Sequence, residues 1–265
     1  MSGSSLPRLR LVLAVSLDGR LAPPEGGPAA IGGRGDRRVL EEALAWADGA
    51  LLGAETLRLH GSTCLIHAPD LLERRARRGL PPQPLALVAS RSGRLPIELP
   101  FFAQPVERWL LRAQASGQDE AMDALQALSG EAAPSVSRMS VAQAPALPSG
   151  FARVIPLQSW EPALRQLAAA GVQRLVVLGG ASLAASLLAE NHLDELQLTL
   201  CPKLLGGGRT WLGPMAVLPA GVRSGWRLLE QRSLEGDELL LLYGRHPHGE
   251  GGATDGQHPG SPLPH

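Results

Sequence analysis

Aromatic side chains are scarce in this sequence: Phe, Trp and Tyr make up 3% of its 265 residues, although 44% of the residues are hydrophobic. A buried core must therefore be built mainly from Leu, Val and Ala. Lysine is also scarce, because Lys203 is the only one in the chain. The 25 Lys and Arg residues balance 25 Asp and Glu residues, so the formal net charge is zero. This balance argues against a nucleic-acid-binding protein, which usually carries a basic excess or a basic face.

Cysteines and long apolar runs are few as well. Cys64 and Cys201 lack the spacing of a metal site or a disulfide framework, so we predict no metal and expect both to be small buried residues. No segment reaches the roughly 20 apolar residues that a membrane-spanning helix needs. The apolar stretch 9–17 is followed by Asp-Gly-Arg at 18–20 rather than by a small-residue cleavage site. We expect a soluble, cytoplasmic protein that contacts neither a membrane nor a nucleic acid.

Apolar segments alternate with amphipathic segments along most of the chain. Strands are expected at 9–15, 50–52, 85–89, 106–111, 154–155, 175–178, 196–200, 226–231 and 238–243, and helices at 36–46, 161–170 and 181–188. The last two strands are joined through Glu-Gly-Asp at 235–237, which is typical of a hairpin. This order predicts an α/β fold with a central, mostly parallel sheet flanked by helices and with a C-terminal antiparallel hairpin.

Composition sets the limits of this predicted domain, which covers residues 8–245 after a short N-terminal extension at 1–7. Residues 114–150 are rich in Ala, Ser, Gln and Pro, and we expect a partly flexible insertion there with one short helix at 120–128. Residues 246–265 are dominated by Gly, His and Pro and have no apolar period, which predicts a disordered tail.

A pair of glycines, Gly179 and Gly180, separates an expected strand from an expected helix. Without Cβ atoms the backbone can approach a ligand closely, and the start of the helix offers free N–H groups and a positive dipole end to a phosphate. An ordinary tight turn would give the same pattern. A second glycine cluster at 206–208, after the next strand, favours a cofactor cleft.

Several turn segments are expected at the carboxyl ends of the parallel strands. These segments are 16–19, 53–56, 90–91 and 179–180. Ligands of open α/β sheets bind at this edge. The four segments are therefore predicted to converge on one site.

The same segments, in the same order, resemble the pyrimidine reductase of riboflavin biosynthesis, the reductase half of the bifunctional deaminase-reductase. The matching pieces are 16–22, 48–56, 90–96, 179–183 and 193–208, within roughly residues 8–245. The resemblance implies a dihydrofolate-reductase-like fold and a dimeric enzyme. The His-x-Glu and Cys-x-x-Cys ligands of the zinc deaminase half are absent from this sequence.

What the resemblance implies is an NADPH-dependent reduction of 5-amino-6-(5-phosphoribosylamino)uracil to its ribitylamino product. Carried over by position, the cofactor-binding residues would be Gly53, Thr56, Ser90, Arg91, Gly179, Gly180, Ala181, Ser182, Leu183 and Gly206. Arg91 would favour NADPH over NADH through the 2′-phosphate. Ser16 and Asp18 would border the substrate. Arg58 is a further substrate candidate, with a plain exposed position as the alternative, and no catalytic acid or base is identified.

Two departures from the family pattern affect the substrate side. His60 and Gly61 stand where the family has a carboxylate, and Leu178 stands where Glu commonly precedes the glycine pair. Loss of these acceptors leaves two other hypotheses open: a reductase of the same fold that acts on another small carbonyl or imine, or a non-catalytic nucleotide-binding member. Asp18 could also be a simple turn residue, and Thr56 a simple helix cap.

Overall fold

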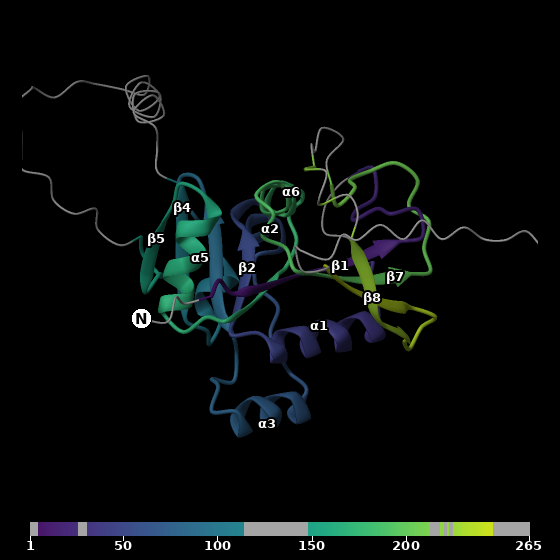
Figure 1. Ribbon diagram of the computed structural model, residues 1–265, viewed down its shortest axis with the longest axis horizontal. Helices are drawn as coiled ribbons and strands as arrows, with labels where there is room; N and C mark the ends of the chain where they lie inside the picture. Colours follow the sequence, from purple (N-terminus) through teal and green to yellow (C-terminus); the bar gives the residue numbers. More distant parts are fainter. Residues whose placement is uncertain are drawn as a thin grey trace, which may run out of the picture.

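A computed structural model describes residues 5–25, 31–113, 148–212, 218–219, 222 and 225–245. They form a sheet of nine strands in the order β5-β4-β3-β2-β6-β1-β7-β9-β8, which runs across the molecule in Figure 1. The strands are β1 (Arg8–Ser16), β2 (Gly49–Gly53), β3 (Leu85–Ser90), β4 (Arg108–Ala113), β5 (Arg153–Leu157), β6 (Arg174–Val177), β7 (Glu195–Cys201), β8 (Trp226–Ser233) and β9 (Leu239–Arg245).

Every pair from β5 to β7 in this order is parallel, whereas β9 is antiparallel to both β7 and β8. The predicted sheet with its C-terminal antiparallel hairpin is therefore confirmed. The predicted helix at 120–128 and the predicted tail at 246–265 lie outside the described residues. Among the described residues, no helix is both long and apolar enough to cross a membrane.

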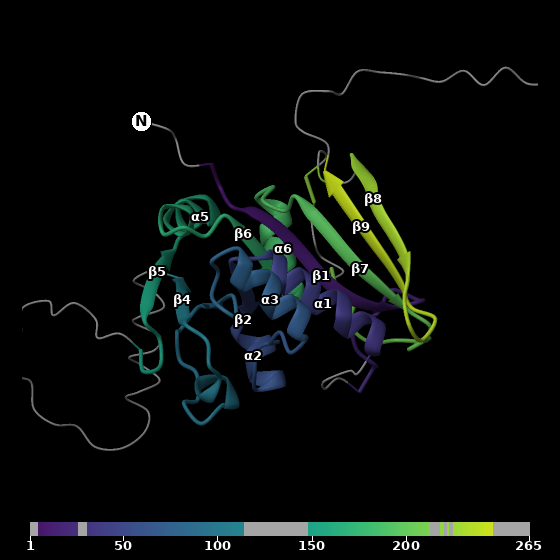
Figure 2. The same ribbon diagram turned by 90° about the horizontal axis from the view of Figure 1, so that it is seen from below.

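Helices cover both faces of the sheet, as Figure 2 shows for α1 and α5. The helical segments are α1 (Arg34–Trp46), α2 (Ala54–His60), α3 (Pro69–Arg77), the 3-10 turn η1 (Pro100–Ala103), α5 (Trp160–Ala169) and α6 (Ala181–Ala189). Successive strand residues point to opposite faces, so Leu51 packs with α5 and α6 while Ala50 packs with α1. The core is mainly aliphatic, as the low aromatic content predicts, with buried Trp160 on the α5 side and a contact of Phe101 with Phe151 beside α2.

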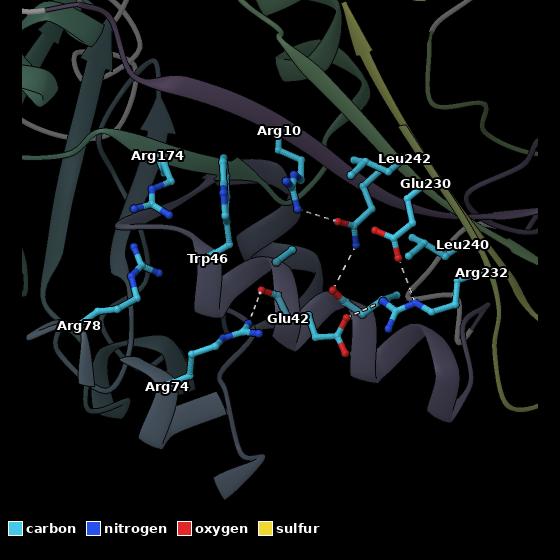
Figure 3. Close-up of a pocket in the computed structure, with 13 residues that line it drawn as sticks. Arg10, Glu42, Trp46, Arg74, Arg78, Arg174, Glu230, Arg232, Leu240 and Leu242 are labelled. Atoms are coloured by element: carbon cyan, nitrogen blue, oxygen red, sulfur yellow. Dashed lines mark hydrogen bonds and ion pairs between the residues drawn. The ribbon is translucent and has the colours of Figure 1, made fainter. Parts of the chain in front are cut away.

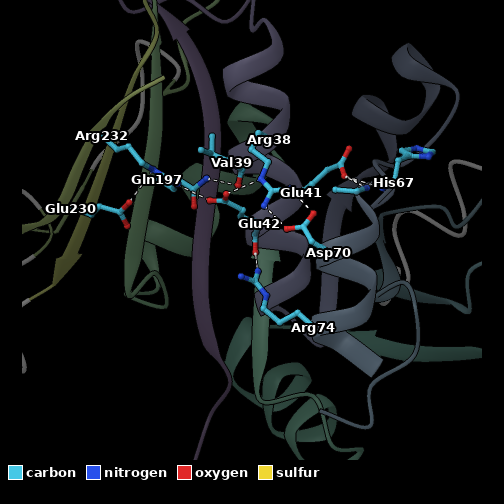
Figure 4. Close-up of polar contacts among 11 residues, drawn as sticks. Arg38, Val39, Glu41, Glu42, His67, Asp70, Arg74, Gln197, Glu230 and Arg232 are labelled. Carbon is cyan, nitrogen blue, oxygen red and sulfur yellow. Dashed lines mark hydrogen bonds and ion pairs between the residues drawn. The ribbon is translucent and has the colours of Figure 1, made fainter. Parts of the chain in front are cut away.

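α2 and α3 are not among the helices expected from the sequence. α3 begins with Pro69 in its first turn and is held against α1 by polar contacts (Figure 4). Arg38 of α1 donates two hydrogen bonds to Asp70, at 2.9 and 2.6 Å. Buried Glu41 accepts the N–H groups of His67 and Ala68 at the start of α3.

A fully buried arginine completes this contact. Arg75 of α3 donates to the carbonyl oxygens of Leu44 and Ala47, at 3.1 and 2.6 Å, where α1 ends. Burial lowers the pKa of Arg75 to about 10. The guanidinium group thus satisfies carbonyls that a helix end leaves without partners.

The buried face of β7 is polar. Its alternating residues Glu195, Gln197, Thr199 and Cys201 are buried toward α1, whereas the intervening leucines are only partly buried. Gln197 donates to the carbonyl oxygen of Val39 in α1. Burial of Cys201 is confirmed, but Cys64 is exposed, so the prediction of two buried cysteines is half wrong.

Candidate functional site at the carboxyl edge of the sheet

Four neighbouring strands place the predicted turns side by side. The order β2-β6-β1-β7 brings together the carboxyl ends at Gly53, Val177, Ser16 and Cys201. β3, which ends at Ser90, lies beside β2. The convergence expected from the strand pattern is therefore present in the fold.

The start of α2 meets the start of α6 through Thr56 and Gly180. A Cβ atom at Gly180 would lie 3.2 Å from Thr56 Oγ1, which is tighter than ordinary contact. Gly179 and Gly180 also have φ values of 85° and 99°, a conformation that favours glycine. The turn geometry thus requires the glycine pair, of which Gly179 is buried and Gly180 is half-buried.

Both helices begin without a side-chain cap from any described residue, α2 after Gly53 and α6 after Gly180. The first N–H groups of two adjacent helices therefore face the same edge with partial positive charge. Ser182 is exposed, whereas Leu183 is buried in the core, so Leu183 can offer a ligand only its backbone. This arrangement suits a phosphate or pyrophosphate group.

Asp18 connects the turn after β1 to the segment after β7. Its Oδ1 accepts hydrogen bonds from the Ser16 hydroxyl at 2.6 Å and from the Leu205 N–H at 3.1 Å. Its Oδ2 accepts the Gly206 N–H at 2.9 Å. The Ser16 hydroxyl, the largest contribution, together with these backbone groups holds the pKa of Asp18 below its ordinary value. Asp18 is thus a turn residue whose charge joins two loops at the predicted substrate side.

The glycine run after β7 packs against the β1 turn. A Cβ atom at Gly208 would lie 2.2 Å from the carbonyl oxygen of Ala22, so glycine is required there. Beside it, exposed Arg209 forms an ion pair with Glu55 of α2 at 3.3 Å. Sequence patterns pointed to Gly206 but gave no sign of this Glu55–Arg209 contact, because nothing in the local sequence links residues 154 positions apart.

A third part of the edge lies beyond β2, around the turn after β3. Ser90 is buried, and its hydroxyl accepts the N–H of Gly93 at 3.0 Å. Arg91 is exposed and forms no hydrogen bond or ion pair within the described part of the chain. Arg58 donates to the carbonyl oxygen of Arg94 at 2.7 Å. The structure therefore brings Arg58, predicted for the substrate side, next to the turn predicted for the cofactor.

A cavity of about 640 Å³ opens beside this turn. Its lining residues are Arg58, Gly93, Arg94, Leu95, Pro96, Ile97, Pro148, Ser149 and Phe151. Two arginines and an apolar wall meet in it, a combination that fits an aromatic ring with a nearby phosphate.

The two departures from the family pattern occupy ordinary structural positions. His60 is exposed in the last turn of α2, and Gly61 ends that helix with a φ of 74°. Leu178 donates its N–H to the carbonyl oxygen of Leu51 and packs against the apolar clusters beneath α1 and α2. Neither position supplies a carboxylate to the edge.

The strand order and the antiparallel β9–β8 edge define a dihydrofolate-reductase-like α/β fold. A model of the RibD C-terminal domain matches residues 7–235. The chain belongs to this family, as its resemblance to the pyrimidine reductases of riboflavin biosynthesis predicted.

Individual relatives agree with this assignment. The 2,5-diamino-6-ribosylamino-4(3H)-pyrimidinone 5′-phosphate reductase of Archaeoglobus fulgidus is 26% identical over 201 residues, which cover 76% of this chain and 83% of the relative. A pyrimidine reductase-like protein of Corynebacterium diphtheriae has a similar structure, with a TM-score of 0.67, 18% identity and coverage of 91% and 92%. Acinetobacter baumannii RibD gives a TM-score of 0.66 at 18% identity, and this chain spans 59% of its length.

Proposed function

We propose that this chain is an NADPH-dependent reductase that acts on a ribosylamino-pyrimidine 5′-phosphate of riboflavin biosynthesis. Family membership supports the reaction class, and the two adjacent uncapped helix starts of α2 and α6 support dinucleotide binding. When bound, the cofactor would supply a hydride to C1′ of the ribose, so that the C1′–O4′ bond breaks and O4′ takes a proton. The chain's own residues would orient the two ligands and exclude water.

The cofactor pyrophosphate would lie on the backbone of Gly179 to Leu183, with Gly53 and Thr56 on the nicotinamide side. Exposed Arg91 would pair with the adenosine 2′-phosphate next to Ser90. The contact between Arg58 and Arg94 favours a role for Arg58 on this adenosine side rather than at the substrate. Guanidinium groups suit this task because they bind phosphate oxygens in pairs.

The substrate would lie on the other side of the edge, near Ser16 and Asp18. Gly206, expected on the cofactor side, lies beside them through its hydrogen bond to Asp18. The side chain of Arg20 lies between the two loops, with Nε 3.9 Å from Asp18 Oδ2. That buried Nε has no hydrogen-bond partner within the described residues. We therefore add Arg20 to the substrate candidates, as a donor to the pyrimidine or the phosphate.

Two pyrimidines are candidate substrates, and an activity assay distinguishes them. 5-Amino-6-(5-phosphoribosylamino)uracil is the first candidate, and the 2,5-diamino pyrimidinone phosphate named for the Archaeoglobus fulgidus relative is the second. NADPH oxidation followed with each compound decides between them. If NADPH binds but neither compound is reduced, another carbonyl or imine substrate becomes the better hypothesis. If NADPH does not bind, the chain is a non-catalytic member.

We further propose a cytoplasmic homodimer. All but the first residue of the edge strand β8 are exposed, among them Leu228 and Leu229, which are 43% and 41% exposed. An open edge strand with exposed leucines favours pairing with another chain. A second copy placed along β8 would cover both.

A further inference from the structure

A second cavity, of about 370 Å³, lies at the amino-end half of the sheet, between α1, α3 and strands β7, β9 and β8. Figure 3 shows its lining, which is Arg10, Val39, Glu42, Ala43, Trp46, Arg74, Arg78, Arg174, Gln197, Glu230, Arg232, Leu240 and Leu242. At a strand rise of about 3.3 Å, Arg10 is about 20 Å from Ser16 on β1 and Arg174 is about 10 Å from Val177 on β6, and none of the lining residues belongs to the turns at the carboxyl edge. It is therefore separate from the site described above.

Positive charge in this cavity exceeds negative charge. Its five arginines face two glutamates, and both glutamates are already paired: Arg232 contacts Glu42 at 2.6 Å and Glu230 at 3.2 Å. Arg10 is held by Glu195 at 2.5 Å. The other three arginines, Arg74, Arg78 and Arg174, form no ion pair with any described residue.

The guanidinium groups of Arg78 and Arg174 point toward one another beside Trp46 (Figure 3). Arg10 lies over the indole ring of Trp46 at 4.2 Å, and Arg174 is 5.8 Å from its centre. These cation–π contacts orient the side chains of Arg10 and Arg174. Like charges aimed at one another repel unless an anion lies between them.

Capping of α1 is the simplest other explanation for arginines at this place, because cations stabilise the carboxyl end of a helix. Arg75 already fills that role from a buried position, with two hydrogen bonds to the last carbonyls of α1. Arg78 adds only one bond, to the carbonyl oxygen of Ala45 at 3.2 Å, and Arg174 adds none. Their charges therefore exceed what the helix end requires.

The side of the cavity opposite Arg78 and Arg174 contains four apolar residues, set among the paired charges of Glu42, Glu230 and Arg232 (Figure 3); they are Val39, Ala43, Leu240 and Leu242. A ligand that satisfies both walls must have an anionic end and a partly apolar body. The volume is within the range of small-molecule sites. We propose that this cavity binds a phosphate monoester of mononucleotide size, with its phosphate between Arg78 and Arg174 and its body against the apolar wall.

The test is calorimetric binding of adenosine 5′-monophosphate, with adenosine and inorganic phosphate as partial ligands. The variant carries Arg78→Gln and Arg174→Gln together. The matched control is Arg77→Gln, which directly precedes Arg78, is paired with Glu73 and does not line the cavity. We expect the double variant to bind the nucleotide at least tenfold more weakly, with wild-type affinity in the control. Adenosine and phosphate alone should each bind more weakly than the nucleotide.

Two further measurements separate this cavity from the carboxyl edge and from a structural role. NADPH binding should be the same in wild type and the double variant, because neither Arg78 nor Arg174 belongs to the turns of that edge. The double variant should melt at or above the wild-type temperature without ligand, since it relieves repulsion, and the nucleotide should raise the melting temperature of wild type alone. Unchanged nucleotide affinity in the double variant would overturn the proposal, as would equal weakening in Arg77→Gln or equal affinity for adenosine.

Discussion

The N–H of Gly206 donates to Asp18 Oδ2 over 2.9 Å, across 188 positions of sequence. This bond and its neighbour from Leu205 make Asp18 a side-chain connection between the two loops of the proposed substrate side, beside the backbone bond from Leu17 to Lys203. The carboxylate of Asp18 already accepts hydrogen bonds from the protein, so a substrate would bind to it in addition to these contacts.

Asp18→Asn should lower kcat/KM for the pyrimidine about tenfold or more, because an amide has only one oxygen to accept the three hydrogen bonds now made. NADPH affinity should be unchanged, since the cofactor would lie on α2 and α6. Steady-state kinetics and a fluorescence titration with NADPH measure the two effects. A loss of NADPH affinity would show that the edge is not divided in this way.

Gly180→Ala should abolish the rise in melting temperature that NADPH causes in wild type. The new Cβ would lie 3.2 Å from Thr56 Oγ1 and would stand on the half-buried backbone that the pyrophosphate is proposed to approach. Gly171→Ala is a matched control, because Gly171 also has a positive φ, at 92°, but has open space around it. Both variants should lose stability through backbone strain, and only Gly180→Ala should lose the response to NADPH.

NADPH should raise the melting temperature more than NADH at equal concentration. Arg91 is free of other described partners and is placed to read the 2′-phosphate. In Arg91→Gln the two shifts should become equal, whereas in Arg165→Gln, an exposed arginine paired with Glu161, the difference should remain. Equal shifts in wild type would remove the proposed role of Arg91.

Asp36→Asn should raise the free energy of unfolding at pH 7. Burial raises the pKa of the Asp36 carboxyl above its ordinary value of 3.8, and the Glu238 carboxylate raises it further. The folded state therefore holds this proton more tightly, so its contribution to stability is present below 3.8 and is lost as pH rises through the raised pKa. The difference in free energy of unfolding between the variant and wild type should increase as the pH is raised from 4 to 7. Urea unfolding at several pH values measures it.

Asp70→Asn is the control of opposite sign. The Arg38 guanidinium holds the pKa of Asp70 below its ordinary value, so the stability it contributes is present above 3.8 and is lost as pH falls through the lowered pKa. At pH 7 this variant should be less stable than wild type. If both variants shift in the same direction at pH 7, burial is not what sets the behaviour of Asp36.

Leu229→Arg should reduce dimer formation through β8, because it places a charge on the exposed edge that would meet the second copy. Light scattering at micromolar concentration should give a dimer for wild type and a monomer for the variant. Arg227→Gln, a change on the same strand that adds no charge, should leave the dimer intact. A wild-type monomer would rule out the proposed assembly.

The parallel sheet could be predicted from local sequence, because each central strand is an apolar run that ends in a turn. It also identified Gly179 and Gly180, whose positive φ values leave a clear residue signature. It missed α3, a short and highly charged helix whose stability comes from contacts of Asp70 and Arg75 with α1. Such contacts join segments about 30 residues apart, and hydrophobic periodicity along the sequence does not predict them.

The site was harder to predict than the fold for the same reason. Asp18 and Gly206 were each identified from turn signals, but the hydrogen bond between them exists only once β1 and β7 are adjacent. Arg58 was placed on the substrate side because of its loop position in the family pattern. Its contact with the carbonyl oxygen of Arg94 depends on how α2 packs beside β3.

The polar face of β7 has a consequence for how α1 is positioned. Apolar side chains would hold a helix by contact area alone, which changes little when the helix rotates or slides by a fraction of a turn. Gln197 donates to Val39 in the middle of α1, while Glu238 of the adjoining hairpin accepts the N–H groups of Gly33 and Asp36 at its start. Hydrogen bonds are directional, so these three are satisfied together in one orientation only. These hydrogen bonds therefore fix both the rotation of α1 about its axis and its position along the sheet.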